Sequence, residues 1–102
     1  MSGKLNFDDV CGQLSVGVIV PLTEIQWNKL AAKFPTVEKI ATGMGGFIQL
    51  VKRPVPGKKS AAWAIVEEPK PKARVIRPLK NEKEARALIA ERLAAYERMW
   101  DG

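Results

Sequence analysis

The chain has no histidine, and Cys11 is its one cysteine among 102 residues. Histidine is the commonest metal ligand and the side chain whose ordinary pKa lies nearest neutrality. Without it, a zinc site would consist mostly of carboxylates, and neither a Ser–His nor a Cys–His nucleophile pair can form within one chain. We therefore expect a protein that is not an enzyme and binds no metal or cofactor, with catalysis by carboxylates or lysines as the remaining alternative.

Long apolar runs are also missing. The longest one, residues 16–20 together with Leu22, is far below the roughly 20 residues that a membrane-spanning helix needs. Residues 1–9 lack the apolar core of a signal peptide, because Asp8 and Asp9 fall where that core would begin. These two absences predict a cytoplasmic protein without a membrane partner.

The length and the composition fit one globular domain. With 46% hydrophobic and 27% charged residues, a chain of 102 residues can bury a core that needs no disulfide or metal to stabilise it. No change of composition marks a boundary, so we predict a single domain over residues 1–102. Residues 1–13 are polar and lack periodicity, and we expect them to be loosely ordered.

Two helices are indicated by their first residues and by apolar residues at helical spacing. Thr23 begins a capping box, and the stripe that follows predicts a helix over residues 23–34, which Pro35 ends. Asn81 is a suitable cap for a second helix, which a longer stripe predicts over residues 82–100.

Three strands are expected at residues 47–53, 61–67 and 72–77, because β-branched and aromatic residues there are separated by proline-containing turns. Residues 14–20 and 37–42 carry weaker strand signals and are compatible with strand or loop. The sequence therefore predicts an α+β fold: an antiparallel three- to four-stranded meander with two helices packed on one face, in the order (β)-α-β-β-β-(β)-α.

The net charge of +6 is concentrated in the middle of the chain. Residues 46–80 have a net charge of +7, whereas residues 1–45 sum to zero and residues 81–102 to −1. Phosphate contacts by basic side chains release counterions and favour binding, so this segregation is typical of a small nucleic-acid-binding module for DNA or RNA. The predicted contact residues are Lys52, Arg53, Lys58, Lys59, Lys72, Arg74 and Arg77.

A second interpretation is a protein-interaction or regulatory module. Lysines on loops and edge strands also keep an exposed sheet soluble without binding anything. Exposed edge strands can accept a strand from a partner, and the alanine-rich surface of the second helix allows a homodimer. The partner therefore stays open between nucleic acid, an acidic protein and a second copy of the chain.

The three tryptophans are the side chains best suited to stack on bases. Trp27 and Trp100 fall on the apolar stripes of the two predicted helices, and Trp63 lies on a strand with apolar residues on both faces. Core packing is the predicted role of all three.

The predicted layout of a helix, a three-stranded meander and a C-terminal helix resembles double-stranded-RNA-binding domains. A basic three-stranded sheet followed by a helix is also similar to the arm-binding domains of phage-type integrases. The resemblance is one of topology. The loop histidine of the first family has no counterpart here, and the lysine cluster at the start of its last helix is reduced to Lys80 and Lys83.

Overall fold

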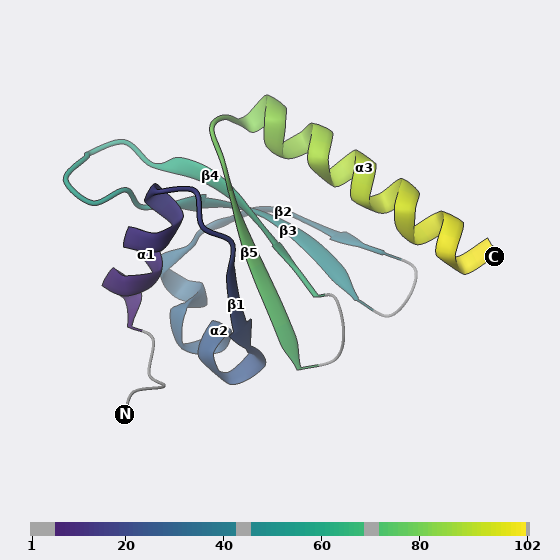
Figure 1. Cartoon of the computed structure of the whole chain (residues 1–102), viewed down its shortest axis with the longest axis horizontal. Helices are drawn as coiled ribbons and strands as arrows, with labels where there is room; N and C mark the ends of the chain where they lie inside the picture. The colour runs from purple at the N-terminus through teal and green to yellow at the C-terminus, as the bar shows by residue number, and fades with distance from the viewer. Residues whose placement is uncertain (1–5, 43–45, 69–71, 102) are drawn as a thin grey trace.

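The computed structural model describes residues 6–42, 46–68 and 72–101 of the chain. Five strands form one antiparallel sheet in the spatial order β1-β5-β4-β3-β2, with helices on both faces (Figure 1). Along the chain the elements are α1 (Phe7–Ser15), β1 (Val20–Thr23), α2 (Glu24–Leu30), the 3-10 turn η1 (Ala31–Lys33), β2 (Thr36–Ala41), β3 (Phe47–Arg53), β4 (Ala62–Glu67), β5 (Ala73–Leu79) and α3 (Glu82–Asp101). The α+β class is confirmed, with more strands and helices than predicted.

The strands β2 to β5 form the predicted meander. Each pairs antiparallel with the next along the chain, which decides the open assignment of residues 37–42 in favour of strand. β1 completes the sheet at the other edge by pairing with β5, from Val20 opposite Ile76 to Thr23 opposite Ala73. The two edges of the sheet are therefore β1 and β2.

One face of the sheet is covered by α1, α2 and η1. Phe34, directly after η1, is fully buried at the centre of this layer, with its ring centroid 5.7 Å from those of both Phe7 and Trp27. The burial of Trp27 confirms its predicted core role. The buried cluster consists of Val10, Cys11, Leu14, Val20, Leu22, Trp27, Leu30, Phe34, Val51, Ala64, Val66 and Ile76.

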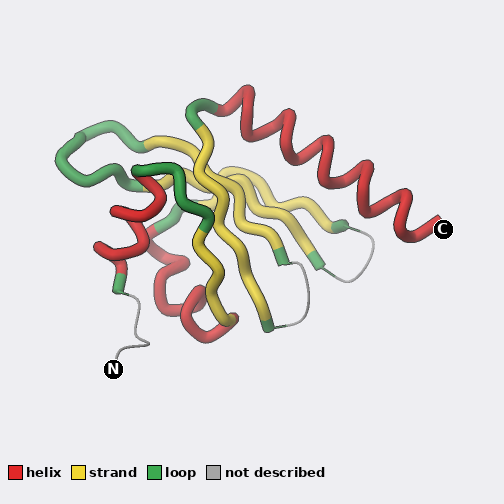
Figure 2. The backbone as a smooth tube through the Cα atoms, in the orientation of Figure 1, coloured by secondary structure: helices red, strands yellow, loops and turns green. Residues whose placement is uncertain are grey.

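The opposite face is covered by α3, and Figure 2 shows this helix separated from α1 and α2 by the sheet. Ala85, Ile89 and Tyr96 of α3 form a second buried cluster with three residues of β3 and β4, namely Ile48, Leu50 and Ile65. The side chain of Trp100, near the end of α3, lies outside the described part of the structure.

The prediction that the helices pack on one face is wrong, and the reason lies in the central strands. Successive side chains of a strand point to opposite faces, and Ala64, Ile65 and Val66 of β4 are all fully buried. A sheet that is apolar on both faces needs a cover on each. The fold therefore departs from the layout on which the topological resemblance rests.

The N-terminal part also differs from the prediction. Residues 7–13, expected to be loosely ordered, belong to α1, whose cap Asn6 accepts a hydrogen bond from the amide of Asp9 at 2.8 Å. Because α1 extends to Ser15 and β1 begins only at Val20, the open assignment of residues 14–20 is decided against a strand over most of that range.

A buried carboxylate joins α3 to the sheet. Glu67 at the end of β4 is 1% exposed, and its Oε2 accepts hydrogen bonds from Tyr96 Oη at 2.7 Å and Arg92 Nε at 2.8 Å. Arg77 Nε lies 3.4 Å from its Oε1. Burial alone would raise the pKa of the Glu67 carboxyl, but the hydrogen bonds from Tyr96 and Arg92 and the two arginine charges outweigh it, so the pKa is lowered.

This lowered pKa predicts a loss of stability in acid. In the unfolded chain the carboxyl of a glutamate titrates at about pH 4.3. As the pH falls towards that value, the unfolded chain therefore binds more protons than the folded one. The contribution of Glu67 is therefore fully present at neutral pH and is lost as the pH falls through its folded pKa. We expect the free energy of unfolding, measured in urea from pH 7 downwards, to decline less steeply for Glu67→Gln than for the parent chain. If the free energy of unfolding declined equally in both proteins, Glu67 would not have a lowered pKa in the folded state.

Candidate nucleic-acid interface

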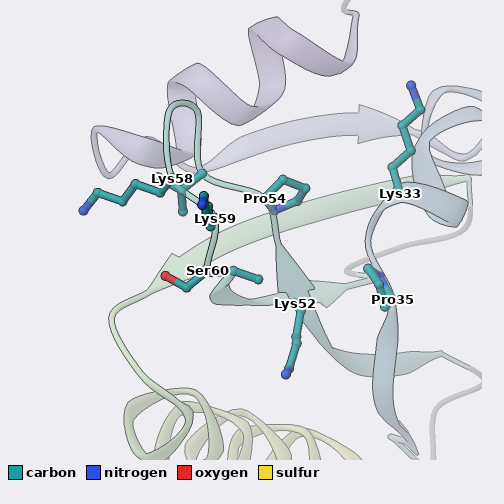
Figure 3. Close-up of a pocket in the computed structure, with 9 residues that line it drawn as sticks. Lys33, Pro35, Lys52, Pro54, Lys58, Lys59 and Ser60 are labelled. Atoms are coloured by element: carbon teal, nitrogen blue, oxygen red, sulfur yellow. The ribbon is translucent and has the colours of Figure 1, made fainter.

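A groove of about 270 Å³ lies at the end of the sheet where β3 leads into β4 (Figure 3). Its walls come from the end of η1, the segment entering β2, the end of β3 and the loop between β3 and β4. The lining residues are Lys33, Pro35, Lys52, Pro54, Val55, Lys58, Lys59, Ser60 and Ala61.

The loop between β3 and β4 takes its shape from proline and glycine. Lys58 donates its backbone N–H to the carbonyl oxygen of Val55 at 3.0 Å, which closes a four-residue turn. Pro56 stands second in this turn, and Gly57 stands third with φ of 78°, the arrangement that a type II turn requires. The turn places Lys58 and Lys59 together at the mouth of the groove.

The opposite wall is fixed by Phe34 and by one backbone hydrogen bond. The amide of Lys52 donates to the carbonyl oxygen of Pro35 at 3.0 Å, which joins the end of β3 to the segment after η1. Since Phe34 is fully buried, its neighbours Lys33 and Pro35 are held in place beside that strand. Residues distant in sequence thus form one surface.

The groove carries four positive charges. Its nine lining residues all belong to the described part of the chain, and none is acidic. No carboxylate of the described residues forms an ion pair with Lys33, Lys52, Lys58 or Lys59. The ammonium of Lys33 lies 4.7 Å from the ring centroid of Phe7, and that of Lys52 lies 5.4 Å from that of Trp63. These two cations therefore rest on aromatic rings, which leaves their charge available to an anion.

The lysine side chains of the groove diverge and do not converge on one point. In Figure 3, Lys33 and Lys52 extend in opposite directions, and Lys58 points outward from the loop. Like charges repel, so this spacing also keeps the cost of gathering four cations low. The arrangement suits an anion with several separated charges better than a single small one.

Lys52, Lys58 and Lys59, three of the seven predicted contact residues, are brought together in this groove. Lys72 is exposed but lies at the opposite end of the sheet, just before β5, where its carbonyl oxygen accepts the backbone N–H of Glu24 at 2.9 Å. The predicted basic surface is thus divided between the two ends of the sheet.

The three predicted arginines are engaged within the fold. Arg53 is 9% exposed and donates its Nε to the carbonyl oxygen of Trp63 at 2.9 Å. Arg74 is 5% exposed and forms ion pairs with Glu68 at 3.1 Å and Glu24 at 3.4 Å. Arg77 faces Glu67, as described above. The planar fork of arginine suits buried carboxylates and carbonyls, whereas lysine keeps its compact ammonium in water. Residue type therefore separates structural cations from available ones.

Lys33 is the groove residue that sequence reasoning missed. It belongs to the segment of residues 1–45, whose net charge is zero, so the charge distribution along the chain gave no reason to select it. The one local signal is its place at the end of the apolar stripe before Pro35, which indicates exposure but not function.

Compared with protein families, with curated proteins and with solved structures, the chain finds no significant match. Within the described ranges, no helix combines the length and the apolar composition that crossing a bilayer requires. The same ranges contain no cluster of three or more His, Cys, Asp or Glu side chains suited to a metal ion. Function therefore has to be inferred from the groove itself.

Proposed function

We propose that this chain is a small nucleic-acid-binding module of the cytoplasm, without catalytic activity, which holds the phosphate backbone in the lysine groove. One observation carries the proposal: four lysines line a single groove that has no acidic lining residue, and no carboxylate in the described part of the chain pairs with them. Each phosphate that they neutralise releases condensed counterions, which is the main source of affinity for a polyanion.

The geometry of the lysines also sets the expected mode of binding. Ammonium groups are point charges, and phosphate contacts fix position without reading sequence. Because the lysine side chains diverge from the groove, an extended backbone with spaced charges can contact several of them in succession. We expect binding that is weakly sequence-specific and that weakens steeply as salt is added.

Charge reversal in the loop tests this proposal. In Lys58→Glu/Lys59→Glu, two phosphate contacts are lost and two repulsions are added, so we expect affinity for short oligonucleotides to fall by about tenfold or more at low salt. The slope of log affinity against log salt should become shallower by roughly 1.4 to 1.8, the value for two phosphate contacts on single or double strands. Fluorescence anisotropy over a salt series measures both quantities.

The matched control is Lys29→Glu/Lys72→Glu, which makes the same change in net charge at exposed positions outside the groove. Compared at about 0.1 M salt, it should retain affinity within about threefold, since charge effects beyond the Debye length of about 10 Å are screened there. Equal losses in the two double variants would show that net charge, and not the groove, determines binding. No binding by the parent chain at low salt would end the proposal.

A protein-interaction role is the second candidate, and the edge strand β2 favours it. Five of its six residues are exposed and Ile40 is partly buried. The exposed residues include the apolar Val37. An open edge can pair with a strand of a partner or of a second copy. A dimer detected by sedimentation and dissociated by Val37→Lys would support this role. A monomer of 11.3 kDa at all concentrations would argue against self-association.

A further inference from the structure

Trp63 is an aromatic side chain in contact with Lys52, one of the groove lysines. It lies directly opposite Lys52 in the pairing of β3 with β4, so both side chains emerge on the face that α3 covers. On its other side Trp63 pairs with Leu79 of β5, after which comes the exposed Lys80. The indole therefore has Lys52 on one side and Leu79 on the other.

The packing of Trp63 is incomplete. Trp27 is buried in the core cluster between α2 and the sheet. Trp63 is only half-buried and packs against the second cluster, beneath α3. The backbone beneath it is fixed by the hydrogen bond from Arg53 to its carbonyl oxygen. The sheet thus holds a partly open indole in a fixed position at the edge of the groove, with the ammonium of Lys52 over its ring.

We propose that the ligand is a single-stranded nucleic acid, one base of which stacks on Trp63 while the adjoining phosphates lie in the lysine groove. This inference rests on the proposed function, because it places the backbone in the same groove. The stacked base displaces the Lys52 ammonium from the ring, and that ammonium then contacts a phosphate. A flat indole beside the groove lysine Lys52 accepts any base, since every base has a π-face. A duplex gains nothing from Trp63 because its bases already stack on one another.

Three probes separate stacking from charge: a short oligothymidine, an abasic strand of equal length and a hairpin duplex. The abasic strand keeps the phosphates but has no bases, so the parent chain should bind it about tenfold more weakly than oligothymidine. In Trp63→Leu this difference should disappear, while affinity for the abasic strand and for the duplex stays unchanged. Trp63→Phe, which keeps an aromatic face, should retain most of the preference for oligothymidine.

The outcomes distinguish the two proposals. If none of the probes binds the parent chain, the proposed function fails and this inference with it. If the abasic strand and oligothymidine bind equally, or if Trp63→Leu weakens binding to all three probes alike, the groove still binds phosphates but stacking on Trp63 is excluded. Circular dichroism shows whether Trp63→Leu and Trp63→Phe are folded. If Trp63→Leu is unfolded, its loss of binding to all three probes says nothing about stacking, and the preference of Trp63→Phe for oligothymidine over the abasic strand decides the question.

Discussion

Glu67→Ala is expected to lower the free energy of unfolding by about 3 kcal/mol, because breaking a buried ion pair from one side leaves its partners without compensation. The substitution leaves the buried hydroxyl of Tyr96 without the acceptor that now lies 2.7 Å away. It also leaves Arg77 and Arg92 without their shared carboxylate. Their side chains are 32% and 35% exposed, so water partly replaces the lost contacts, which is why we expect the lower end of the usual range.

Two further variants show which part of the network matters. Glu67→Gln keeps the shape and one oxygen for Tyr96 but removes the charge, and should cost about 1–2 kcal/mol as a charged hydrogen bond is replaced by neutral ones. Tyr96→Phe removes a single hydrogen bond and leaves the ion pairs, with an expected loss of about 1–2 kcal/mol. Urea unfolding at pH 7 measures all three changes. A Glu67→Ala protein as stable as the parent chain would show that the network makes no net contribution to stability.

Glu67 is distant from the lysine groove, at the other end of β4. Its substitution should therefore leave the affinity of the folded protein for oligonucleotides unchanged within about twofold, as expected for sites that share no partners. Stability and binding are separable in this fold because the two groups of cations are separate. Arg74 and Arg92 join helices to the sheet through carboxylates, whereas the lysines of the groove have no carboxylate partner among the described residues.

The elements that could be predicted from the sequence are those with strong local signals. β3 lies at residues 47–53 as expected, because β-branched residues there end at a proline. α3 begins after Asn81, whose side chain accepts the amide of Glu84 at 2.8 Å. α1 was missed because it is short and polar at its start, and its apolar residues become meaningful only when β1 and β5 are present to bury them.

The arrangement of the layers and of the site depends on tertiary contacts that local patterns do not contain. The apolar residues on both faces of β4 indicate two covers, but not which helix covers which face. The groove likewise depends on the bond from Lys52 to Pro35, which brings Lys33 beside residues of a distant segment. Counting Lys and Arg as equal charges placed Arg53 and Arg74 on a surface that they do not reach.

Phe34→Ala is expected to lower the free energy of unfolding at least as much as Glu67→Ala does. Unlike Glu67→Ala, it is also expected to disturb the groove and weaken binding. The ring is fully buried and contacts Phe7 of α1 and Trp27 of α2. Truncating a buried phenylalanine costs about 3–5 kcal/mol through lost burial and the cavity that remains. In a domain of this size that corresponds to a fall in melting temperature of roughly 15–25 °C.

The same ring also fixes the wall of the groove. Phe34 leaves the helical region with φ of −122° and ψ of 81°, as proline favours for the residue before it, and its buried ring anchors the segment that contains Lys33 and Pro35. Once the ring is removed, Lys33 loses its fixed place in the wall of the groove. We therefore expect Phe34→Ala, measured well below its melting temperature, to bind oligonucleotides several-fold more weakly than the parent chain.

Phe34→Leu is the control for this double effect. Leucine fills most of the volume and should cost about 1–1.5 kcal/mol, with the groove and the affinity preserved. Thermal unfolding followed by circular dichroism, and anisotropy at a temperature where every variant is folded, give the two measurements. If Phe34→Ala loses stability and yet binds as tightly as the parent chain, Lys33 takes no part in the interface. The groove would then be reduced to Lys52 and the loop lysines.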